Sequence, residues 1–475
     1  MKNDFDGRVL GFVCTPQAIA DVMLSLRTNH GRTLDPACGH SKGVFEPSIP
    51  DIVGVELSAD RGGSGAVITD FMSYPLTERF DTIIGNPPYV KAADIFSATK
   101  ALFEPGTLDG RANLYLHFIE KCVRHLLPGG ELIFINPREF LQATSSARLN
   151  TWILSQGAIT HLIDLGEAPV FPDAAPSCVI WRFEKGTAQG ALSFSSGVPP
   201  KWVAKNVIDS RGALFPVSQP HPLRLSDFAS VKVGAVSGAD TIYTHPDGEA
   251  FVVSTTAVSG GTRRMLTCQH PWLLAHKPQL MQRRIRRFDE DNWWQWGRQC
   301  PRTTAVRVYV NVKTRNPRPF FTHPCGLFDG SVLAVFPRTT GDVDAFCAAL
   351  NAVDWAGLGF MCGGRYLFNQ RSLENAPLPA EFVENLLHKK RICGSLSSPK
   401  PDQKRNHHAL PRNHEETEQA STARRTLSAC EVVSTAREMG AAVESQRPSV
   451  FFLGGGGKSR DQPRESRDRP PGARR

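Results

Sequence analysis

The stretch DTIIGNPPYV (residues 81–90) decides the fold. Apolar and β-branched residues run up to Gly85, and Asn86 is then followed by two prolines and Tyr89. Neither proline has an N–H to donate to a sheet, and each turns the preceding residue away from a helix. We therefore expect a buried strand that ends at Gly85 and opens into a stiff loop. Such a loop holds the Asn86 amide, the Pro87 carbonyl and the Tyr89 ring in one orientation.

Short apolar segments on either side of this strand predict the rest of a sheet. They are rich in β-branched residues and alternate with helical segments, which is typical of a mainly parallel, doubly wound α/β sheet covered on both faces. In such a sheet, ligands bind beyond the carboxyl ends of the strands. The predicted strands are TLD (33–35), DIVGVEL (51–57), GAVITD (65–70), FDTIIGN (80–86), GELIFIN (130–136), ITHLIDL (159–165) and SCVIWRFE (177–184).

The composition changes twice along the chain. Residues 1–188 carry the alternation of strands and helices, whereas residues 189–388 have shorter strands and clustered tryptophans, which predicts a separate α+β domain. Residues 389–475 are polar and rich in Arg, Pro and Gly, which predicts a disordered basic tail. Of the 55 Lys and Arg residues, 16 lie from Arg391 onward, against 10 of the 46 Asp and Glu. Most of the net charge of +9 thus belongs to the tail, and the charge alone is weak evidence for a nucleic-acid partner.

Composition also argues against several classes of protein. The 475 residues are 41% hydrophobic, contain no run of 18 apolar residues, and begin with MKNDFDGRVLGF, which lacks the regions of a signal peptide. We therefore expect a cytoplasmic protein without membrane contact. The 11 cysteines are scattered without a Cys-x-x-Cys pair, which indicates reduced thiols and neither a disulfide framework nor a cysteine zinc site. The sequence predicts no metal site.

Three further strand ends carry residues that suit a nucleotide-like ligand. LDPACGHSKGVF (34–45) places Asp35 before small residues and glycines, a turn that lets a ligand approach backbone N–H groups. Glu56 ends the next strand, at the distance where a Rossmann-type sheet presents an acid to ribose hydroxyls. Asp70 and Phe71 follow the third strand, where an exocyclic amine and an adenine face can be met.

Together with NPPY, these strand ends resemble the S-adenosylmethionine-dependent N6-adenine DNA methyltransferases of type II restriction-modification systems. Three other segments extend the resemblance to the gamma-ordered group of that family, over residues 8–185. They are similar to its N-terminal helix motif, to its helix, Pro-Gly-Gly turn and fifth strand, and to its later base-binding motif. These segments are GFVCTPQAIADVML (11–24), NLYLHFIEKCVRHLLPGGELIFINP (113–137) and APVFPDAAPSCVIWRFEK (168–185). The resemblance implies a Rossmann-like seven-stranded sheet and a C-terminal α+β target-recognition domain.

The resemblance also implies roles for individual residues. The Asn86 side-chain oxygen and the Pro87 carbonyl accept the two hydrogens of adenine N6, which exposes the nitrogen lone pair to the cofactor's methyl group. The adenine is flipped out of the duplex, and Tyr89 and Phe171 sandwich its ring. The implied catalytic residues are Asn86, Pro87, Pro88, Tyr89 and Phe171. The implied cofactor-binding residues are Thr15, Asp35, Ala37, Gly39, Glu56, Asp70 and Phe71.

One loop departs from the family pattern. Gly39-His40-Ser41-Lys42-Gly43 is two residues longer than the Gly-x-Gly step that the family has after Ala-Cys. Either the longer loop still holds the cofactor through Gly39, or it binds the cofactor more weakly than the family's loop does. We interpret His40 and Lys42 as solvated loop residues.

The second domain holds the residues expected at DNA. KVGAVSGADTIYTH (232–245) resembles the entry to the target-recognition region of related methylases. Clustered cations follow it, suited to phosphates or guanine edges, although the acids of FDEDNWWQW can neutralise them and leave an ordinary solvated face. The cations are Arg283, Arg284, Arg286 and Arg287, with Lys313, Arg315 and Arg318 as a second group. We interpret Trp293, Trp294 and Trp296 as core or groove wall.

Other substrates fit the same chemistry. Glutamine methylases of release factors also carry NPPY, and an RNA amine methylase is possible for the same reason. Those protein methylases resemble a short helical domain followed by a sheet, whereas here the cofactor region begins by residue 11 and a long second domain follows. A non-catalytic DNA-binding subunit is disfavoured by the intact NPPY and by Glu56 and Asp70. We expect a monomer that methylates double-stranded DNA and protects host sites, with the cognate restriction endonuclease as a separate protein.

Overall fold

The computed structural model describes residues 14–40, 43–62, 65–166, 177–299, 302–339, 341–362, 364–384 and 386. Phe171 and the predicted basic tail lie outside the described residues. Within the described ranges, none of the helices has both the length and the apolar character needed to cross a membrane.

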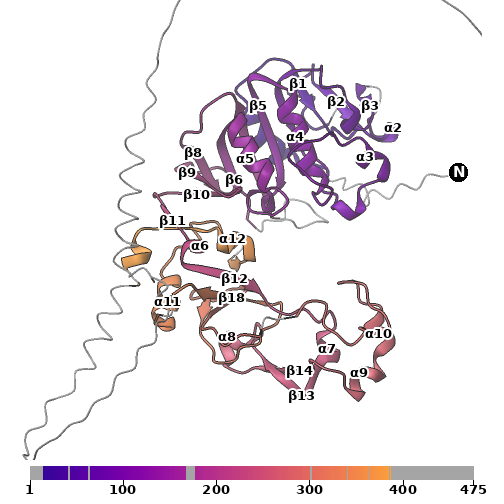
Figure 1. Ribbon diagram of the computed structural model, residues 1–475. Coiled ribbons are helices and arrows are strands. Elements are labelled where there is room, and N and C mark those ends of the chain that lie inside the picture. The colour runs from indigo at the N-terminus through magenta and orange to yellow at the C-terminus, as the bar shows by residue number, and fades with distance from the viewer. Residues whose placement is uncertain are drawn as a thin grey trace, which may run out of the picture. The chain divides into compact units, whose positions relative to one another are not determined.

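A mixed sheet of ten strands organises the N-terminal half of the chain (Figure 1). Its order is β10-β9-β8-β6-β7-β5-β4-β1-β2-β3. Strands β1 to β5 pair with one another in parallel, and β7 lies antiparallel between β5 and β6. The strands are β1 Thr33–Asp35, β2 Val53–Glu56, β3 Val67–Ile68, β4 Phe80–Gly85, β5 Leu126–Pro137, β6 Gly157–Asp164, β7 Cys178–Lys185, β8 Leu192–Ser196, β9 Val203–Ser210 and β10 Ala213–Val217. All seven strands predicted from the sequence are present, as β1 to β7.

The sheet is larger than the predicted seven strands. Strand β8 pairs in parallel with β6, and β9 and β10 follow in antiparallel pairs. They extend the β6 edge, whose N–H and C=O groups would otherwise lack partners. The sequence predicts a second domain over this stretch, because the alternation of helices and strands ends before it. The sheet therefore runs to Val217, past residue 188, where the sequence places the end of the catalytic domain.

Helices cover both faces of the sheet. On β5, Leu132 and Phe134 join a buried cluster with α4 and α5, whereas Ile133 and Ile135 join a cluster with α1 on the other face. A strand buried on both sides produces this period of two. The helices are α1 Gln17–Ser25, α2 Ala59–Gly62, α3 Ser97–Ala101, α4 Leu114–His125 and α5 Ala147–Gln156, with the 3-10 turns η3 Phe71–Ser73, η4 Ala92–Asp94 and η5 Arg138–Leu141.

Residues 223–378 form smaller sheets and short helices. The antiparallel sheet β12-β18-β15-β17 shares a buried cluster with α11, which includes Val231 and Leu350. A second cluster, which includes Tyr243 and Leu273, joins the β13–β14 pair to α9. The elements are β11 Leu223–Arg224, α6 Leu225–Phe228, β12 Ala229–Val233, α7 Asp240–Tyr243, β13 Thr244–Phe251, α8 Thr256–Ser259, β14 Arg263–Met265, α9 Pro271–Ala275, α10 Lys277–Met281, β15 Val308–Asn311, β16 Lys313–Thr314, β17 Phe320–Phe321, β18 Val332–Pro337, α11 Val343–Leu350, β19 Met361–Cys362, β20 Arg365–Leu367, α12 Gln370–Glu374 and β21 Pro377–Leu378.

Candidate active site

A cavity of about 220 Å³ lies at the carboxyl ends of β1, β2 and β4. This is the edge at which an α/β sheet binds its ligands. Most of the residues that the sequence predicts for cofactor binding and catalysis line this cavity. They are Thr15, Asp35, Ala37, Gly39, Glu56, Asp70, Phe71, Asn86 and Pro88.

Asp35 ends β1 and is buried. Burial raises the pKa of its carboxyl group to about 7, a hydrogen bond from the Ala37 N–H (3.1 Å) opposes the shift, and the charge of Glu56 adds to it. A Cβ atom at Gly85 would lie 2.8 Å from Asp35 Oδ1, so β4 needs glycine where it ends beside β1. The negative charge of Asp35 is thus confined in a site that does not fully compensate it.

Glu56 fixes the loop that follows β1. Its Oε2 accepts a hydrogen bond from Gly39 N–H (3.1 Å), and its Oε1 accepts one from Ser58 N–H (3.1 Å). Each carboxylate oxygen has two lone pairs, so both can accept a further hydrogen bond. Glu56 therefore shapes the cavity wall and keeps acceptor capacity for hydroxyl groups of a ligand.

Asp70 is held from two sides. Its Oδ1 caps η3 by accepting from Met72 N–H (2.9 Å), and its Oδ2 accepts from the Thr99 hydroxyl (2.6 Å). The next residue, Phe71, is buried and packs on Phe118 with 4.9 Å between ring centroids. The pair therefore presents a fixed carboxylate beside a fixed aromatic ring.

The loop after β1 depends on two glycines. Gly39 and Gly43 have φ angles of +66° and +81°, and a Cβ atom at Gly43 would lie 2.6 Å from the Cys38 carbonyl oxygen. Both residues and His40 line the cavity. Ser41 and Lys42 lie outside the described residues, so the effect of the longer loop on cofactor affinity stays a prediction.

The NPPY loop follows β4 directly, as the sequence predicts. Asn86 and Pro88 line the cavity, and Pro87 is buried between them. The Tyr89 hydroxyl donates a hydrogen bond to the Ile135 carbonyl (3.0 Å), and burial raises its pKa well above the usual range. Tyr89 is thus anchored by its hydroxyl end to β5, next to the cavity wall. Its stacking on a base, like that of Phe171, stays a prediction.

A segment that the sequence analysis missed completes the cavity wall. Asp94, Phe96 and Thr99 lie on η4, α3 and the link between them, in the crossover from β4 to α4. This segment carries neither a strand end nor a glycine turn, and only the fold of the chain brings it to the cavity. Among the described residues, four acids, with Asp94, line the cavity against Arg61 and His40. The cavity therefore favours a ligand that carries positive charge, hydroxyl groups and an aromatic ring.

The predicted DNA-contacting arginines divide into two kinds. Arg284, Arg286 and Arg287 are exposed, as are Lys313 and Arg315 on a second segment. Arg283 is buried, and its guanidinium lies 3.8 Å from the centre of the Phe288 ring. That guanidinium donates hydrogen bonds to the backbone carbonyls of Ser237, Leu280, Trp293 and Gln295. Arg283 therefore stabilises its own loop and does not belong to the exposed surface that its neighbours form.

The tryptophans beside these arginines pack as the sequence predicts. Trp293 and Trp296 are buried in the cluster around Tyr243, and the Trp296 indole donates to the Leu266 carbonyl (2.8 Å). Their rings therefore belong to the core of this segment.

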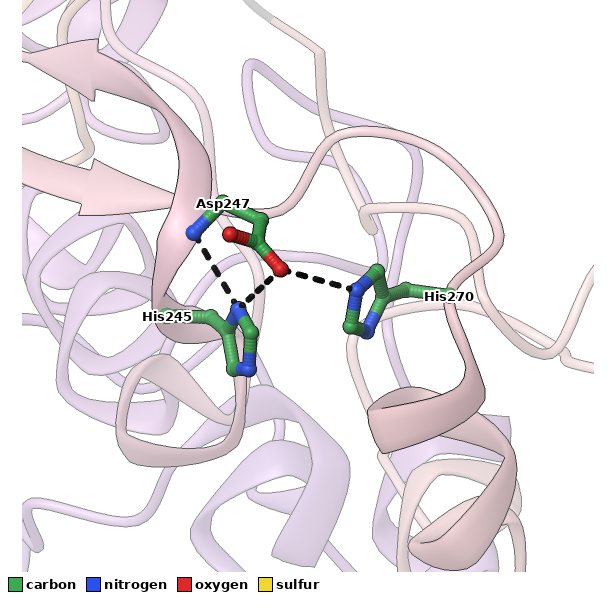
Figure 2. Close-up of side chains that lie close together, drawn as sticks. All are labelled: His245, Asp247 and His270. Carbon is green, nitrogen blue, oxygen red and sulfur yellow. Dashed lines mark hydrogen bonds and ion pairs between the residues drawn. The ribbon is translucent and has the colours of Figure 1, made fainter.

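One group of side chains in the described residues has the composition of a metal site, although the sequence predicts none. His245, Asp247 and His270 approach one another between β13 and α9 (Figure 2). The three residues do not form a compact motif, because 22 residues separate Asp247 from His270. The pairing of β13 with β14 and the packing of α9 against the same segment bring them together.

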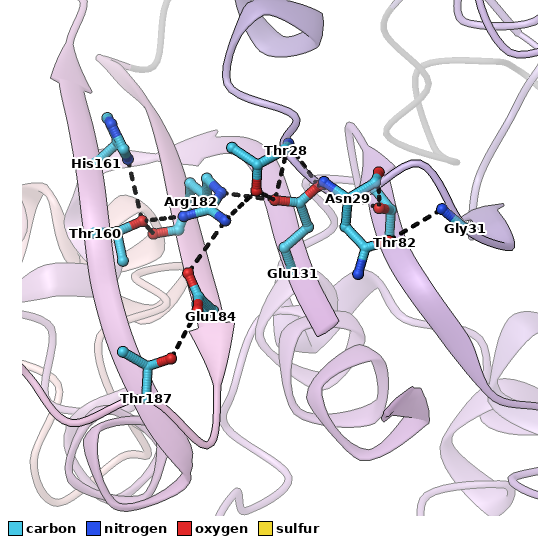
Figure 3. A network of polar contacts seen from close by, with 10 residues as sticks. All are labelled: Thr28, Asn29, Gly31, Thr82, Glu131, Thr160, His161, Arg182, Glu184 and Thr187. Carbon is cyan, nitrogen blue, oxygen red and sulfur yellow. Dashed lines mark hydrogen bonds and ion pairs between the residues drawn. The ribbon is translucent and has the colours of Figure 1, made fainter. Parts of the chain in front are cut away.

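A second polar cluster lies at the opposite, amino-terminal edge of the sheet (Figure 3). Glu131 of β5 is fully buried and forms an ion pair with Arg182 of β7 (2.7 Å). Its carboxylate also accepts from Thr28 N–H (3.0 Å), Asn29 N–H (2.9 Å) and the Thr82 hydroxyl (3.1 Å). The cluster ties the loop before β1 to three strands and has no part in the cavity.

Comparisons with known proteins agree with the motifs at the cavity. Residues 64–171 match the Eco57I restriction-modification methylase family model. The type II methyltransferase M.TthHB8I of Thermus thermophilus is 34% identical over 202 residues, which are 38% of this chain and 46% of that protein. The type II methyltransferase M.HincII of Haemophilus influenzae is 28% identical over 195 residues, which are 37% of this chain and 38% of that protein. The chain thus matches less than half the length of these two relatives.

A solved structure extends the likeness of fold to more of the chain. The type IIL restriction-modification enzyme MmeI, determined in complex with DNA, aligns with 76% of this chain and 64% of its own, with a TM-score of 0.54 and 12% identity. At that identity the likeness concerns the fold alone.

Proposed function

We propose that the chain is a type II DNA methyltransferase that transfers a methyl group from S-adenosylmethionine to N6 of adenine, which the match of residues 64–171 to the restriction-modification methylase model supports. One observation carries this proposal. The Asn86 and Pro88 side chains belong to the wall of the same cavity as the acids at the ends of β1 and β2. A methyl donor and a polarised amine can therefore meet in one place.

The residues that line the cavity support S-adenosylmethionine as the cofactor. Glu56 would accept hydrogen bonds from the ribose hydroxyls, Asp70 would accept from the adenine amine, and Phe71 would pack on the purine. Thr15 and Asp35 would hold the methionine end, whose positive charge suits a buried carboxylate. Ala37 and Gly39 would lie along the ligand where the backbone must come close. The bound cofactor supplies a methyl group on a positively charged sulfur.

The residues of the NPPY loop would activate the acceptor nitrogen. Adenine N6 is a poor nucleophile because its lone pair is delocalised into the ring. The Asn86 side-chain oxygen and the Pro87 carbonyl would accept its two hydrogens, and Pro88 would keep both acceptors in place. The two prolines fix the geometry in advance, so no reorganisation is needed when the base arrives.

The target base would reach this loop by flipping out of the duplex, because N6 is inaccessible to an enzyme inside the helix. Tyr89, anchored to the Ile135 carbonyl, would offer a ring face of fixed orientation. Phe171 would cover the other face. The exposed Arg284, Arg286 and Arg287, with Lys313 and Arg315, would contact DNA phosphates or bases.

The likeness to type II methyltransferases supports a role in a restriction-modification system. We infer a cytoplasmic, monomeric enzyme that protects host sites, with the cognate restriction endonuclease as a separate protein. A protein glutamine methyltransferase or an RNA amine methyltransferase would use the same loop chemistry, and both are outcomes of the test below.

The test is methylation by the purified chain of duplex DNA, RNA and release-factor protein in competition. We expect N6-methyladenine in the DNA at a defined sequence, read by sequencing that detects the modified base. Asn86→Ala should lower the rate by at least ~100-fold, the typical cost of one preorganised polar contact, and leave cofactor binding intact. Preferential methylation of RNA or protein would overturn the DNA assignment, and an Asn86→Ala variant as fast as the wild type would overturn the role of the loop.

A further inference from the structure

His245, Asp247 and His270 lie close together within the part of the chain formed by residues 223–378 (Figure 2). The Asp247 Oδ2 atom is 3.6 Å from His245 Nδ1 and 3.4 Å from His270 Nε2. The three atoms that could bind a metal lie within 4.8 Å of one another. Both imidazoles are partly buried, with side chains 21% and 24% exposed, whereas Asp247 is 67% exposed.

The local fold positions the three side chains. Strand β13 pairs with β14 at Thr244 and again from Glu249, so residues 245–248 bulge out of the ladder. Gly248 closes the bulge against the backbone of Met265, where a Cβ atom would come within 2.3 Å. The bulge therefore points His245 and Asp247 away from the strand pair.

His270 is fixed from the other side. It precedes α9, and its Nδ1 accepts the Trp272 N–H (3.2 Å) as the cap of that helix. The Trp272 indole in turn donates to the Ile242 carbonyl (2.8 Å), and Leu273 is buried in the cluster that also holds Tyr243. The bulge and α9 thus belong to one packed unit.

The distances decide between two interpretations of this cluster. Ordinary N–H···O hydrogen bonds measure about 2.7–3.2 Å, and both contacts of the Asp247 carboxylate are longer. Two ligands of a tetrahedral zinc ion, each about 2.0–2.2 Å from it, are separated by about 3.3–3.6 Å. The observed separations of 3.4 and 3.6 Å fall in this range, and all three candidate ligand atoms lie within 4.8 Å of one another.

We propose that His245, Asp247 and His270 form a binding site for a divalent transition-metal ion, with Zn²⁺ as the best match. Two imidazoles and one carboxylate suit zinc, whereas Mg²⁺ and Ca²⁺ prefer oxygen ligands alone. The exposed side of the cluster leaves the fourth position to water. The ion ties the bulge of β13 to α9, two parts of the chain that share no regular strand pairing.

Metal binding has a cost that the contacts define. The His270 ring must carry its proton on Nδ1 when Nε2 binds the ion, so the long hydrogen bond from Trp272 N–H is lost. His245 likewise gives up its contact with Asp247 N–H (3.2 Å). Both contacts are long and lie at the surface, where water can replace them. The cost is therefore small beside three metal–ligand bonds.

The test measures zinc affinity of the full chain and its variants by competition with a chromophoric chelator. His270→Asn removes the imidazole but keeps a side chain that caps α9 well. Asp247→Asn keeps the shape and removes the charge. Each variant should weaken the tightest zinc site by more than the roughly 10- to 100-fold that follows loss of a mere outer partner. Zinc should also raise the thermal unfolding midpoint of the wild type but not of the variants.

The matched control is His276→Gln, at the end of the same helix and outside the cluster. It should bind zinc as tightly as the wild type, which separates the site from the other histidines among the 14 in the chain. Cobalt in place of zinc should give the strong visible absorption of a four-coordinate site in the wild type and the control. Equal zinc affinity in the wild type, His270→Asn and Asp247→Asn would overturn the proposal, as would a midpoint that zinc does not change. These outcomes are independent of methylation activity.

Discussion

Each of two opposite edges of the sheet holds a buried carboxylate, and these two carboxylates differ in the partners that surround them. At the amino-terminal edge, Glu131 accepts hydrogen bonds from the loop before β1 and pairs with Arg182. At the carboxyl edge, Asp35 accepts one backbone hydrogen bond, from Ala37, and has the Glu56 carboxylate near it. Groups within the fold thus compensate the charge of Glu131, whereas the charge of Asp35 would be compensated by a bound cationic ligand.

The pKa of Glu131 is lowered, whereas the pKa of Asp35 is raised. Burial alone would raise the pKa of Glu131, but the hydrogen bonds from Asn29 and Arg182 outweigh it and lower the pKa below the ordinary value of 4.5. Ionised Glu131 therefore stabilises the fold above pH 4.5, and this contribution is lost as the pH falls through the lowered pKa. The pKa of Asp35 is raised from 3.8 to about 7, so its ionisation costs stability as the pH rises between those values.

The comparison separates structural from functional acids. A carboxylate whose partners are all internal, such as Glu131, stabilises the sheet and needs no ligand. A buried carboxylate beside another acid, in the wall of a cavity, is a group whose charge a cationic ligand would stabilise. Mutations at the two edges should therefore affect different measurements, namely stability at one and ligand binding at the other.

The largest effect on stability is expected at the amino-terminal edge. Arg182→Met keeps most of the side-chain volume but leaves the buried Glu131 charge without its cation, which should lower the free energy of unfolding by about 3–5 kcal/mol. Denaturant unfolding monitored by circular dichroism measures this. Adding Glu131→Gln to this variant should restore part of the loss, because it removes the uncompensated charge.

The same variant tests the separation of the two edges. Cofactor affinity of Arg182→Met should equal that of the wild type under conditions where both are folded. A large drop in that affinity would mean that the amino-terminal cluster shapes the cavity, and the division between structural and functional acids would fail.

Unlike Arg182→Met, a substitution at Glu56 should lower cofactor affinity more than it lowers stability. Glu56→Ala removes the acceptor of the Gly39 N–H bond and the acceptor that we propose for the ribose hydroxyls, so cofactor affinity measured by calorimetry should fall by about 1–3 kcal/mol. Glu56→Gln keeps one acceptor oxygen and should lose less. If Glu56→Ala unfolds as readily as Arg182→Met but binds the cofactor normally, Glu56 belongs with the structural acids.

Much of this site could be predicted from the sequence because its residues follow strands. Asp35, Glu56 and Asn86 each stand directly at a strand end, and parallel strands bring their carboxyl ends to one edge. The seven apolar segments were therefore enough to place these side chains around one cavity. The same logic fails for β8 to β10, which follow β7 without a helical crossover: β8 and β9 mix polar and apolar residues, and the short apolar β10 contains Pro216.

Residues outside strand ends could not be predicted. Thr99 reaches Asp70 from a short helix in a crossover, and no local pattern marks that contact. Arg283 was grouped with its exposed neighbours because a run of arginines gives no sign of which one is buried. His270 lies near His245 because a bulge in β13 and the packing of α9 bring the two together, which spacing in the sequence does not reveal.

The smallest predicted effect is a pH dependence that belongs to Asp35. Because burial raises its pKa to about 7, part of the free protein carries Asp35 in the protonated form near neutral pH. A ligand with positive charge at this position favours the ionised form and lowers the pKa, so binding releases a proton. Affinity for S-adenosylmethionine should therefore rise as the pH is raised toward 7, by up to about tenfold per pH unit, and level off above it.

Asp35→Asn provides the control, because the ligand's own titration is common to both proteins. The variant should bind more weakly above pH 7 and should lose the part of the pH dependence that belongs to Asp35. S-adenosylhomocysteine, which lacks the positive sulfur, should show a shallower dependence with the wild type, since less charge is available to favour ionised Asp35. Parallel pH profiles for wild type and Asp35→Asn would mean that the ligand leaves the Asp35 charge uncompensated. The contrast with Glu131 would then rest on the internal partners of the two acids alone and not on a ligand-binding role.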